Sequence, residues 1–141
     1  MKRKENWELE LAQILKNRAN ASFQWGTHDC CLFAADCVQV MTGIDPAGWF
    51  RNRYSSQAEA CAALEEFAGG GVLEAAEKIC RESGFAEVEI PFGSRGDVAL
   101  VEGNGSDALG VIDMTGTNIA VAGKNGLETV SLHKGKRVWR I

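Results

Sequence analysis

The hydrophobic pattern changes once along the chain, from the period of helices to the period of strands. Residues 5–20, 57–67 and 72–82 carry apolar side chains at helical spacing and predict three amphipathic helices. From residue 85 onward, short apolar runs separated by turn sequences predict strands at 85–90, 97–102, 108–114, 119–122, 127–132 and 137–141. Helices followed by strands are typical of an α+β domain, in which a C-terminal antiparallel sheet packs on N-terminal helices.

A fourth predicted helix is apolar on almost every side. Between Leu32 and Met41 only Asp36 and Gln39 are polar, and these two lie three residues apart on one face. A helix that is apolar all round is a buried helix. Asp29 precedes it as a natural N-cap, so we expect this helix to begin near Asp29 and to run through the core.

Composition and charge narrow the class of protein. A chain of 141 residues can bury a sizeable core, and we expect one domain over residues 1–141. The net charge of −4 argues against nucleic-acid binding. Basic residues gather near both ends, which predicts solvated termini or contact with an acidic partner. The chain lacks an apolar run of the ~18 residues that span a membrane and an apolar signal stretch, so we expect a cytoplasmic protein.

The cysteines predict free thiols in a reducing compartment. There are five, an odd number, with two adjacent and no Cys-x-x-Cys, which does not suit a disulfide framework. Cys61 and Cys80 occupy apolar helical positions, where thiols pack as small hydrophobes. We expect both in the core, and nothing in the sequence points to a cofactor.

The segment 23–31 (Phe-Gln-Trp-Gly-Thr-His-Asp-Cys-Cys) is the strongest candidate for chemistry. It places Cys30 at the amino end of the buried helix, where unpaired N–H groups stabilise an anion. A thiolate stabilised in this way is a nucleophile. Its base would be a histidine, and the chain offers only His28 and His133.

Two other interpretations of this segment remain open. Cys30 and Cys31 can be packing residues, with Asp29 as the cap and His28 bonded to backbone. Alternatively, His28, Cys30 and Cys31 can share a zinc ion with a fourth ligand, although Cys37 lies about 10 Å further along the helix. No second ligand pair has zinc spacing, so we expect no metal site.

Two further polar clusters have a structural and a functional interpretation. Arg95 and Asp97 open a predicted strand, where they either pair with each other or line a cleft near Cys30. A buried acid needs a partner, and we expect Asp36 to find one in Arg51 or Arg53.

The order of several short motifs resembles the NlpC-type cysteine peptidases. These motifs are Trp25-Gly26, Asp29-Cys30 before a hydrophobic helix, Arg95-Gly96-Asp97 before a strand, and Leu109-Gly110-Val111-Ile112 on the next strand. The order is more similar still to a group of small phage and prophage proteins related to these peptidases. The resemblance runs from about Trp7 to Ile141, nearly the whole chain.

The resemblance implies a papain-like fold with Cys30 as nucleophile. It also implies a bacterial cell-wall peptide as the ancestral substrate, cut at an amide next to a D-glutamyl or similar residue. In phages, such domains resemble parts of tail-tip or tail-assembly proteins. We therefore name as candidate catalytic residues Cys30, His28 and Asp97, and as candidate binding residues Trp25, Asp29, Cys31 and Arg95.

The chain departs from the family at the catalytic base. The histidine that precedes the hydrophobic-Gly-hydrophobic strand in the family is replaced by Asp107-Ala108. The third polar residue would fall near Ala120 to Ala122, and the usual Ser-Gly after the nucleophile is Cys31-Leu32. Matching positions therefore assemble no Cys–His pair, and proton transfer alone contributes ~10²–10⁴-fold to catalysis.

Three functions follow from these observations. The first is a degenerate NlpC-like component of a phage tail, with a structural or assembly role and a place in the virion after assembly. The second is an active thiol hydrolase that cuts cell-wall peptide with Cys30 and His28. The third is a bacterial binding module with no phage role. The corresponding partners are phage tail proteins or a cell-wall peptide.

Overall fold

The computed structural model describes residues 2–103 and 105–141. Its helices are α1 (Trp7–Arg18), α2 (Cys30–Thr42), α3 (Gln57–Ala68) and α4 (Val72–Ser83), with short 3-10 helices η1 (Gly48–Phe50), η2 (Ile90–Phe92) and η3 (Leu132–Lys134). Its strands are β1 (Ala86–Val88), β2 (Val98–Glu102), β3 (Asp107–Ile112), β4 (Asn118–Gly123), β5 (Gly126–Ser131) and β6 (Arg137–Arg140). The expected α+β class, helices first and strands afterwards, is confirmed.

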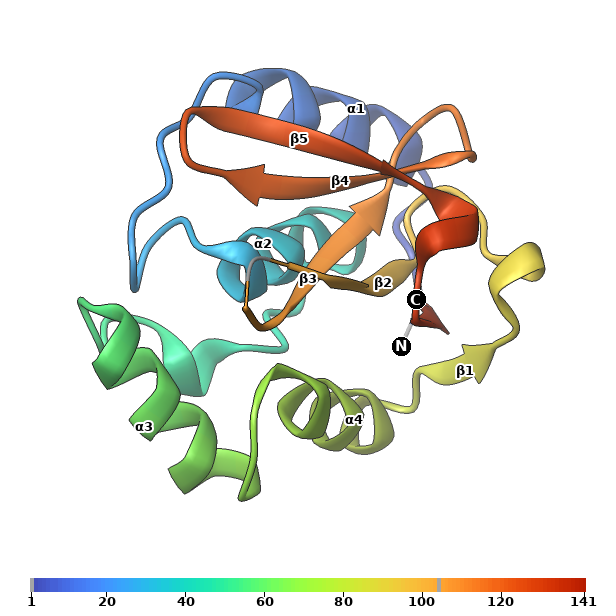
Figure 1. The fold of residues 1–141 in the computed structure, drawn as a ribbon. Coiled ribbons are helices and arrows are strands. Elements are labelled where there is room, and N and C mark those ends of the chain that lie inside the picture. The colour runs from blue at the N-terminus through green and yellow to red at the C-terminus, as the bar shows by residue number, and fades with distance from the viewer. Residues whose placement is uncertain (1, 104) are drawn as a thin grey trace.

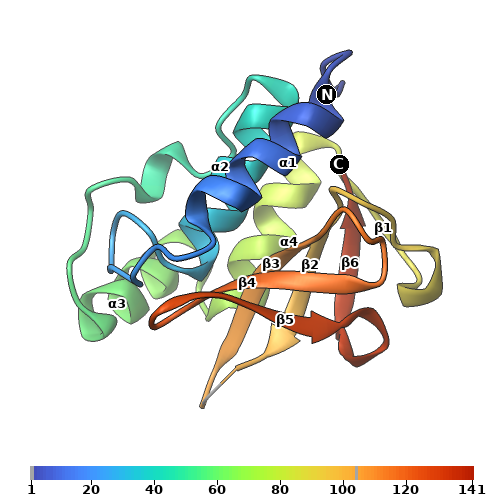
Figure 2. The same cartoon turned by 90° about the horizontal axis from the view of Figure 1, so that it is seen from above.

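The strands form one antiparallel sheet in the order β1-β6-β2-β3-β4-β5. Strands β2 to β5 follow one another as a meander, whereas β6 returns to lie between β1 and β2 (Figure 2). In the centre of the sheet, Val98 pairs with Val111 of β3 on one side and with Trp139 of β6 on the other. Strand β6 therefore pairs with β2 on the side opposite β3. This pairing brings the C-terminal residues beside the start of β2.

Helix α2 occupies the centre of the molecule, as its apolar pattern predicts. It contacts α1 on one side and β3 and β4 on the other (Figure 1). The side chains that it buries are Leu32, Phe33, Ala34, Ala35, Cys37, Val38 and Met41. Gly43 ends the helix in the left-handed conformation, which a residue without Cβ adopts without strain. Cys30 therefore begins a helix whose apolar side chains are mostly buried in the core.

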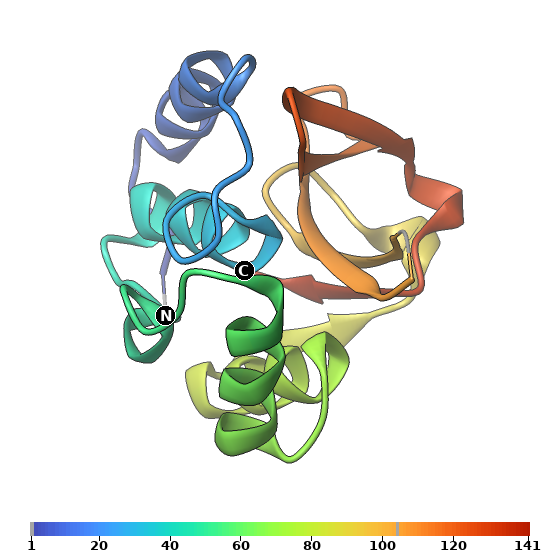
Figure 3. The same ribbon diagram turned by 60° about the vertical axis from the view of Figure 1, so that its left-hand side comes forward.

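The sheet is apolar on both faces because it curls. Val98, Leu100 and Val111 belong to the core shared with α1 and α2, while Ala99 and Ile112 pack on the opposite face with Ile119, Val121 and Val138. Figure 3 shows the strands curving around one side of the molecule and the helices on the other. Strands buried on both faces consist of nearly continuous apolar residues, which explains the composition of β2 and β4.

Two local expectations differ from the structure. The strand predicted at 85–90 is shorter, because Pro91 lacks an N–H for the ladder and the chain forms η2 instead. Cys61 is exposed on α3 rather than in the core, since the inward positions of that helix belong to Ala60 and Ala63. Cys80 is buried as expected, and burial raises its pKa to about 12.

The half-buried acid of α2, Asp36, finds its partner as expected. Asp36 pairs with Arg51 at 2.6 Å and also with Arg18 of α1 at 2.9 Å. Arg53 instead lies over the ring of Trp49, 3.9 Å from the ring centroid. These ion pairs join α1, α2 and the segment after α2. No helix of the described residues has the length and apolar character needed to cross a membrane.

Candidate functional site

The amino end of α2 is held by a fully bonded aspartate. Asp29 is 2% exposed and its carboxylate accepts hydrogen bonds from the backbone N–H of Leu32 at 2.9 Å and of Gly26 at 3.0 Å. The hydroxyl of Tyr54 donates a third bond at 2.6 Å. The expected N-cap is therefore present, and the bond from Tyr54 fastens the helix start to the segment that precedes α3.

Gly26 allows this arrangement by its lack of a side chain. Its φ is +85°, and a Cβ at this position would lie 2.1 Å from the carbonyl oxygen of Tyr54. The loop before α2 and the Tyr54 segment therefore approach each other more closely than any other residue permits. This contact fixes the position of Cys30, which is the first residue of the helix.

Cys30 and Cys31 direct their thiols differently, and the two sulfur atoms lie 3.8 Å apart. Cys30 packs toward the curled inner face of the sheet, whereas Cys31 packs toward the core between helices and sheet. Both residues are half-buried. The two neighbouring thiols therefore contact two different apolar clusters, one on each face of the sheet.

The two thiols have opposite acidity. The hydrogen bond with Cys31 lowers the pKa of Cys30, and the backbone of Leu109 lowers it further, against the effect of burial. The hydrogen bond with Cys30 and burial raise the pKa of Cys31 well above its ordinary value. Of the two thiols, Cys30 is the more acidic, as its position at a helix amino end also favours.

Cys30 lies where two cavities meet. The first, of about 510 Å³, extends between α3 and α4 and is lined by Tyr54, Cys61, Leu64 and Glu74 among others; we call it the helix cavity. The second, of about 760 Å³, extends over the sheet and is lined by Glu102, Ala108, Val121 and Lys124 among others; we call it the sheet cavity. The residues common to both are Trp25, Cys30, Gln57, Ser106 and Asp107. Together the two cavities form a groove with Cys30 at its junction.

Neither histidine of the chain lines this groove. The ring of His28 is buried and turned toward α1, where its Nδ1 accepts a hydrogen bond from Arg18 at 3.0 Å. Burial and the nearby Arg18 lower the pKa of His28, so the ring is neutral with its proton on Nε2. His133 lies on η3 with its Nδ1 2.8 Å from the hydroxyl of Ser131. The expected pairing of Cys30 with His28 is therefore not formed.

The two positions at which the sequence resemblance expects the base, Asp107 and Ala108, both line the groove. Asp107 lines both cavities, and its carboxylate pairs with the ammonium group of Lys136 at 2.8 Å. Ala108 lines the sheet cavity beside Cys30, and both pack against the same cluster on the inner face of the sheet. A methyl group and an ion-paired carboxylate cannot shuttle a proton as an imidazole does.

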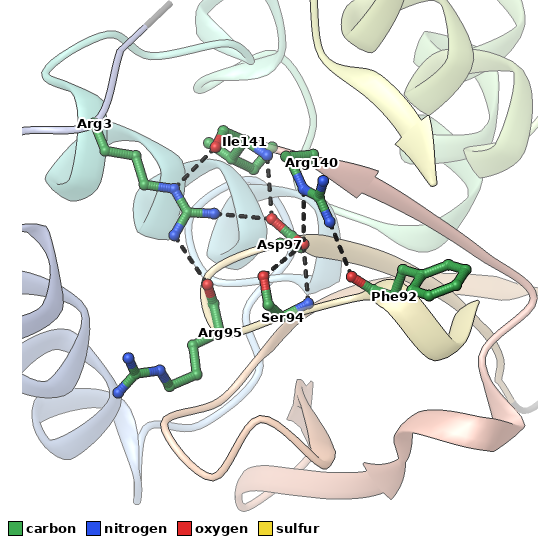
Figure 4. A network of polar contacts seen from close by, with 7 residues as sticks. All are labelled: Arg3, Phe92, Ser94, Arg95, Asp97, Arg140 and Ile141. Carbon is green, nitrogen blue, oxygen red and sulfur yellow. Dashed lines mark hydrogen bonds and ion pairs between the residues drawn. The ribbon is translucent and has the colours of Figure 1, made fainter. Parts of the chain in front are cut away.

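The structure places Asp97 and Arg95 away from the groove, which corrects the expectation that they line a cleft near Cys30. Asp97 is fully buried and pairs with Arg3 at 2.8 Å, accepts from the backbone of Ser94 at 3.0 Å, and receives the N–H of Ile141 at 3.3 Å (Figure 4). Arg95 does not pair with Asp97 but with Glu8 of α1 at 2.8 Å. The two ends of the chain are therefore joined to each other and are not simply solvated.

The candidate binding residues Trp25, Asp29 and Cys31 do line the helix cavity, and Trp25 lines the sheet cavity as well. Sequence reasoning did not assign Tyr54, Gln57 or Asp107 to the site, because their place in the groove depends on how distant segments pack. Among the described residues no group of three or more His, Cys, Asp or Glu side chains is arranged to hold a metal ion. The His28 ring bonds to Arg18 and is not turned toward a site shared with Cys30 and Cys31.

The fold and the sequence match known proteins to different extents. The NlpC/p60 domain of the peptidoglycan hydrolase SagA, known from a crystal structure, is similar to the chain with a TM-score of 0.58 and 12% sequence identity, over 95% of this chain and 98% of that chain. At this identity the likeness concerns the fold, and it confirms the NlpC-type arrangement. No curated protein matches the chain. Residues 2–141 match the family described as "Domain of unknown function (DUF6950)", and the chain belongs to this family.

Proposed function

We propose that residues 1–141 form one NlpC-like domain that binds a peptide of the bacterial cell wall in its groove without cutting it, as a component of a phage or prophage tail. The observation that carries the proposal is the junction of the groove, where Cys30 faces the ligand space while both histidines are bonded elsewhere. The nucleophile is retained and the proton carrier is not.

In amide cleavage, the absence of an imidazole affects the step in which the amine leaves. Expulsion of an amine requires a proton, which a neighbouring acid supplies in the transition state, and this transfer contributes ~10²–10⁴-fold to the rate. Asp107, the titratable side chain that shares both cavities with Cys30, is held by Lys136. The groove therefore has no imidazole to protonate the departing amine, so a bound amide would persist.

The dimensions of the groove support an extended ligand. A chain that crosses Cys30 would occupy the helix cavity on one side and the sheet cavity on the other, with Trp25 in contact with both portions. The choice of a cell-wall peptide rests on the sequence resemblance to NlpC-type peptidases and on the fold shared with a domain of a peptidoglycan hydrolase. The tail role rests on the resemblance to small phage proteins alone.

Calorimetric titration with soluble cell-wall peptides tests the binding role. We expect saturable binding by the full chain and no new products by mass spectrometry after prolonged incubation. Gln57→Ala should weaken binding by about three- to tenfold, because Gln57 lies at the junction. Gln13→Ala, which removes the same side chain from the exposed face of α1, is the matched control and should bind as the wild type. Absence of binding at millimolar peptide would refute the proposal.

Restoring the missing base tests whether the groove is a degenerate catalytic site. Ala108 and Cys30 line the same cavity and pack against the same apolar cluster, so Ala108→His places an imidazole in that cavity, at the position where the resemblance expects one. We expect hydrolysis of cell-wall peptide at least about tenfold above the wild-type background, dependent on Cys30. Ala58→His, on the exposed surface of α3, should stay at the background.

A second candidate function, an active thiol hydrolase, is favoured by one observation. The bonds from Cys31 and Leu109 lower the pKa of Cys30, which is a property of a working nucleophile. Product release by the wild type that is lost in Cys30→Ser would establish this function and would contradict the binding-only role. The tail role has a separate test, because mass spectrometry of purified phage particles should detect the chain, and its absence from them would contradict that role.

A further inference from the structure

The reaction open to Cys30 depends on the group that leaves from the bond that the sulfur attacks. Amide cleavage needs an acid for the departing amine, but attack on a disulfide expels a thiolate, which leaves without a proton. The groove junction offers a thiol and no imidazole. Thiol–disulfide exchange is therefore a reaction that this arrangement can perform with the groups that it contains.

The surroundings of the Cys30 sulfur stabilise its anionic form by geometry. Cys30 is the first residue of α2, whose capped amino end carries partial positive charge. The thiol of Cys31 lies 3.8 Å away, and the backbone of Leu109 in β3 also lowers the pKa of the Cys30 thiol. Two elements of the fold, the start of α2 and strand β3, thus meet at the Cys30 sulfur, and Cys30 also lines two cavities.

Cys31 is the hydrogen-bond neighbour of this sulfur and is not its disulfide partner. Neighbouring Cα atoms are about 3.8 Å apart, whereas bridged cysteines need about 4.4–6.8 Å. A bond between Cys30 and Cys31 would therefore distort the first turn of α2. An adduct formed at Cys30 would not be removed by Cys31 and would persist until an external thiol reduces it.

We propose that Cys30 is a thiol–disulfide exchange site for small disulfides of the glutathione type, with Cys31 as a positioning residue, and that the adduct closes the groove at the junction of its two cavities. In the reaction the Cys30 thiolate attacks one sulfur of the disulfide, a new S–S bond forms, and the other half leaves as a thiolate that takes a proton from water. Cys30 is oxidised, and the disulfide is reduced to one free thiol.

Exposure of the full chain to oxidised glutathione at about pH 6, below the ordinary pKa of a thiol, tests the exchange. Intact mass should show one glutathionyl group, and peptide mapping should place it on Cys30. Cys61 is the internal control within the wild type, since it is exposed on α3, and it should stay unmodified while Cys30 takes up the group. Modification of Cys61 ahead of Cys30, or equal modification of both, would overturn the proposal. Mapping on the wild type decides this even if Cys30→Ser does not fold.

The positioning role of Cys31 has its own readout in the pH profile of the exchange rate. Cys31→Ala removes the donor and should shift the profile to higher pH, with a rate at least about threefold lower at pH 6. Cys31→Ser keeps a donor at the same place and should restore much of the low-pH rate. If Cys31→Ala leaves the profile of the wild type unchanged, Cys31 is a packing residue only.

Control of ligand access is the part that rests on the proposed function. Calorimetry with the same soluble cell-wall peptide should show binding to the reduced chain, at least tenfold weaker binding to the adduct, and recovery after dithiothreitol. Equal affinity of both forms would overturn the closure. If the reduced chain binds no peptide while Cys30 still takes the adduct, the proposed function fails and the exchange site stands, so the two failures are distinguishable.

Discussion

Two buried aspartates, Asp29 and Asp97, stand at the start of a secondary-structure element and differ in what satisfies them. Asp29 is bonded to neutral donors, namely two backbone N–H groups and the hydroxyl of Tyr54. Asp97 is bonded to a cation, the guanidinium of Arg3, with the last residue of the chain as a further donor. Asp29 fixes the start of α2 beside the groove, whereas Asp97 joins the two ends of the chain.

The difference teaches how a buried charge acquires a role. A carboxylate satisfied by neutral donors at a helix start leaves no other charge buried if it is removed. A carboxylate paired with a half-buried arginine leaves an uncompensated cation behind. Both sites are fully buried in the same fold, so their mutational costs measure these two situations directly.

The largest effect is expected at Asp97. Asp97→Ala leaves the guanidinium of Arg3 without its partner and should lower the free energy of unfolding by about 3–5 kcal/mol. Urea unfolding followed by circular dichroism measures the change. Adding Arg3→Leu to Asp97→Ala should recover part of the loss, because it removes the orphaned charge. A cost below about 1 kcal/mol for Asp97→Ala would show that the ion pair is dispensable.

A smaller cost is expected at Asp29. Asp29→Ala removes the N-cap of α2 and leaves the hydroxyl of Tyr54 unpaired, for a loss of about 2–4 kcal/mol in the free energy of unfolding. Asp29→Asn keeps one side-chain oxygen and should cost less. The same urea titration compares both with Asp97→Ala. A cost for Asp29→Ala above that of Asp97→Ala would reverse the order that the two donor types predict.

Removal of one donor alone should have a milder effect. Tyr54→Phe keeps the ring and takes away the hydroxyl bond to Asp29, which should lower the free energy of unfolding by about 1–2 kcal/mol. The remaining bonds from Gly26 and Leu32 keep the carboxylate satisfied. Unchanged stability would mean that the ring, and not its hydroxyl, fastens this segment to the helix start.

The smallest expected effect is a change of stability with pH, and it comes from His28, the residue that precedes Asp29. Burial and Arg18 lower the pKa of His28 in the folded chain, so the unfolded chain takes up a proton more readily as pH falls. Stability should be full above the ordinary histidine pKa of about 6.5 and should decline as pH falls below it. His28→Asn keeps an acceptor for Arg18 and should flatten the urea midpoint between about pH 7 and pH 5.5. An equally steep decline in this variant would assign the dependence to other groups.

The elements of the fold could be predicted from local patterns. The periodicity of α1, α3 and α4, the cap at Asp29 and the change to short strands are properties of neighbouring residues, and the structure confirms them. The return of β6 between β1 and β2 could not be predicted, because the hydrophobic pattern of a strand does not name its neighbours. The exposure of Cys61 could not be predicted for a related reason. Its helix carries several apolar side chains, and the sequence does not show that Ala60 and Ala63 are the ones that are buried.

The candidate site was predictable only in part. Cys30 at a capped helix start follows from the sequence, because capping and the end of a hydrophobic run are local signals. The direction of the His28 ring does not follow from the sequence, because it depends on the hydrogen bond from Arg18 of α1, which competes with any contact to Cys30. The contribution of Gln57 and Asp107 to the groove depends on how distant segments pack.

What the sequence by itself determined is the order of helices and strands, the burial of α2 and the placement of Cys30 at its capped amino end. The tertiary structure decided which partners the charged residues take, since Arg3 meets Asp97 across 94 positions of the chain. It also decided that Cys30 shares its groove with Cys31 and Asp107 and not with an imidazole. Backbone conformation depends on near neighbours, whereas the company of a buried side chain depends on the packing of the whole molecule.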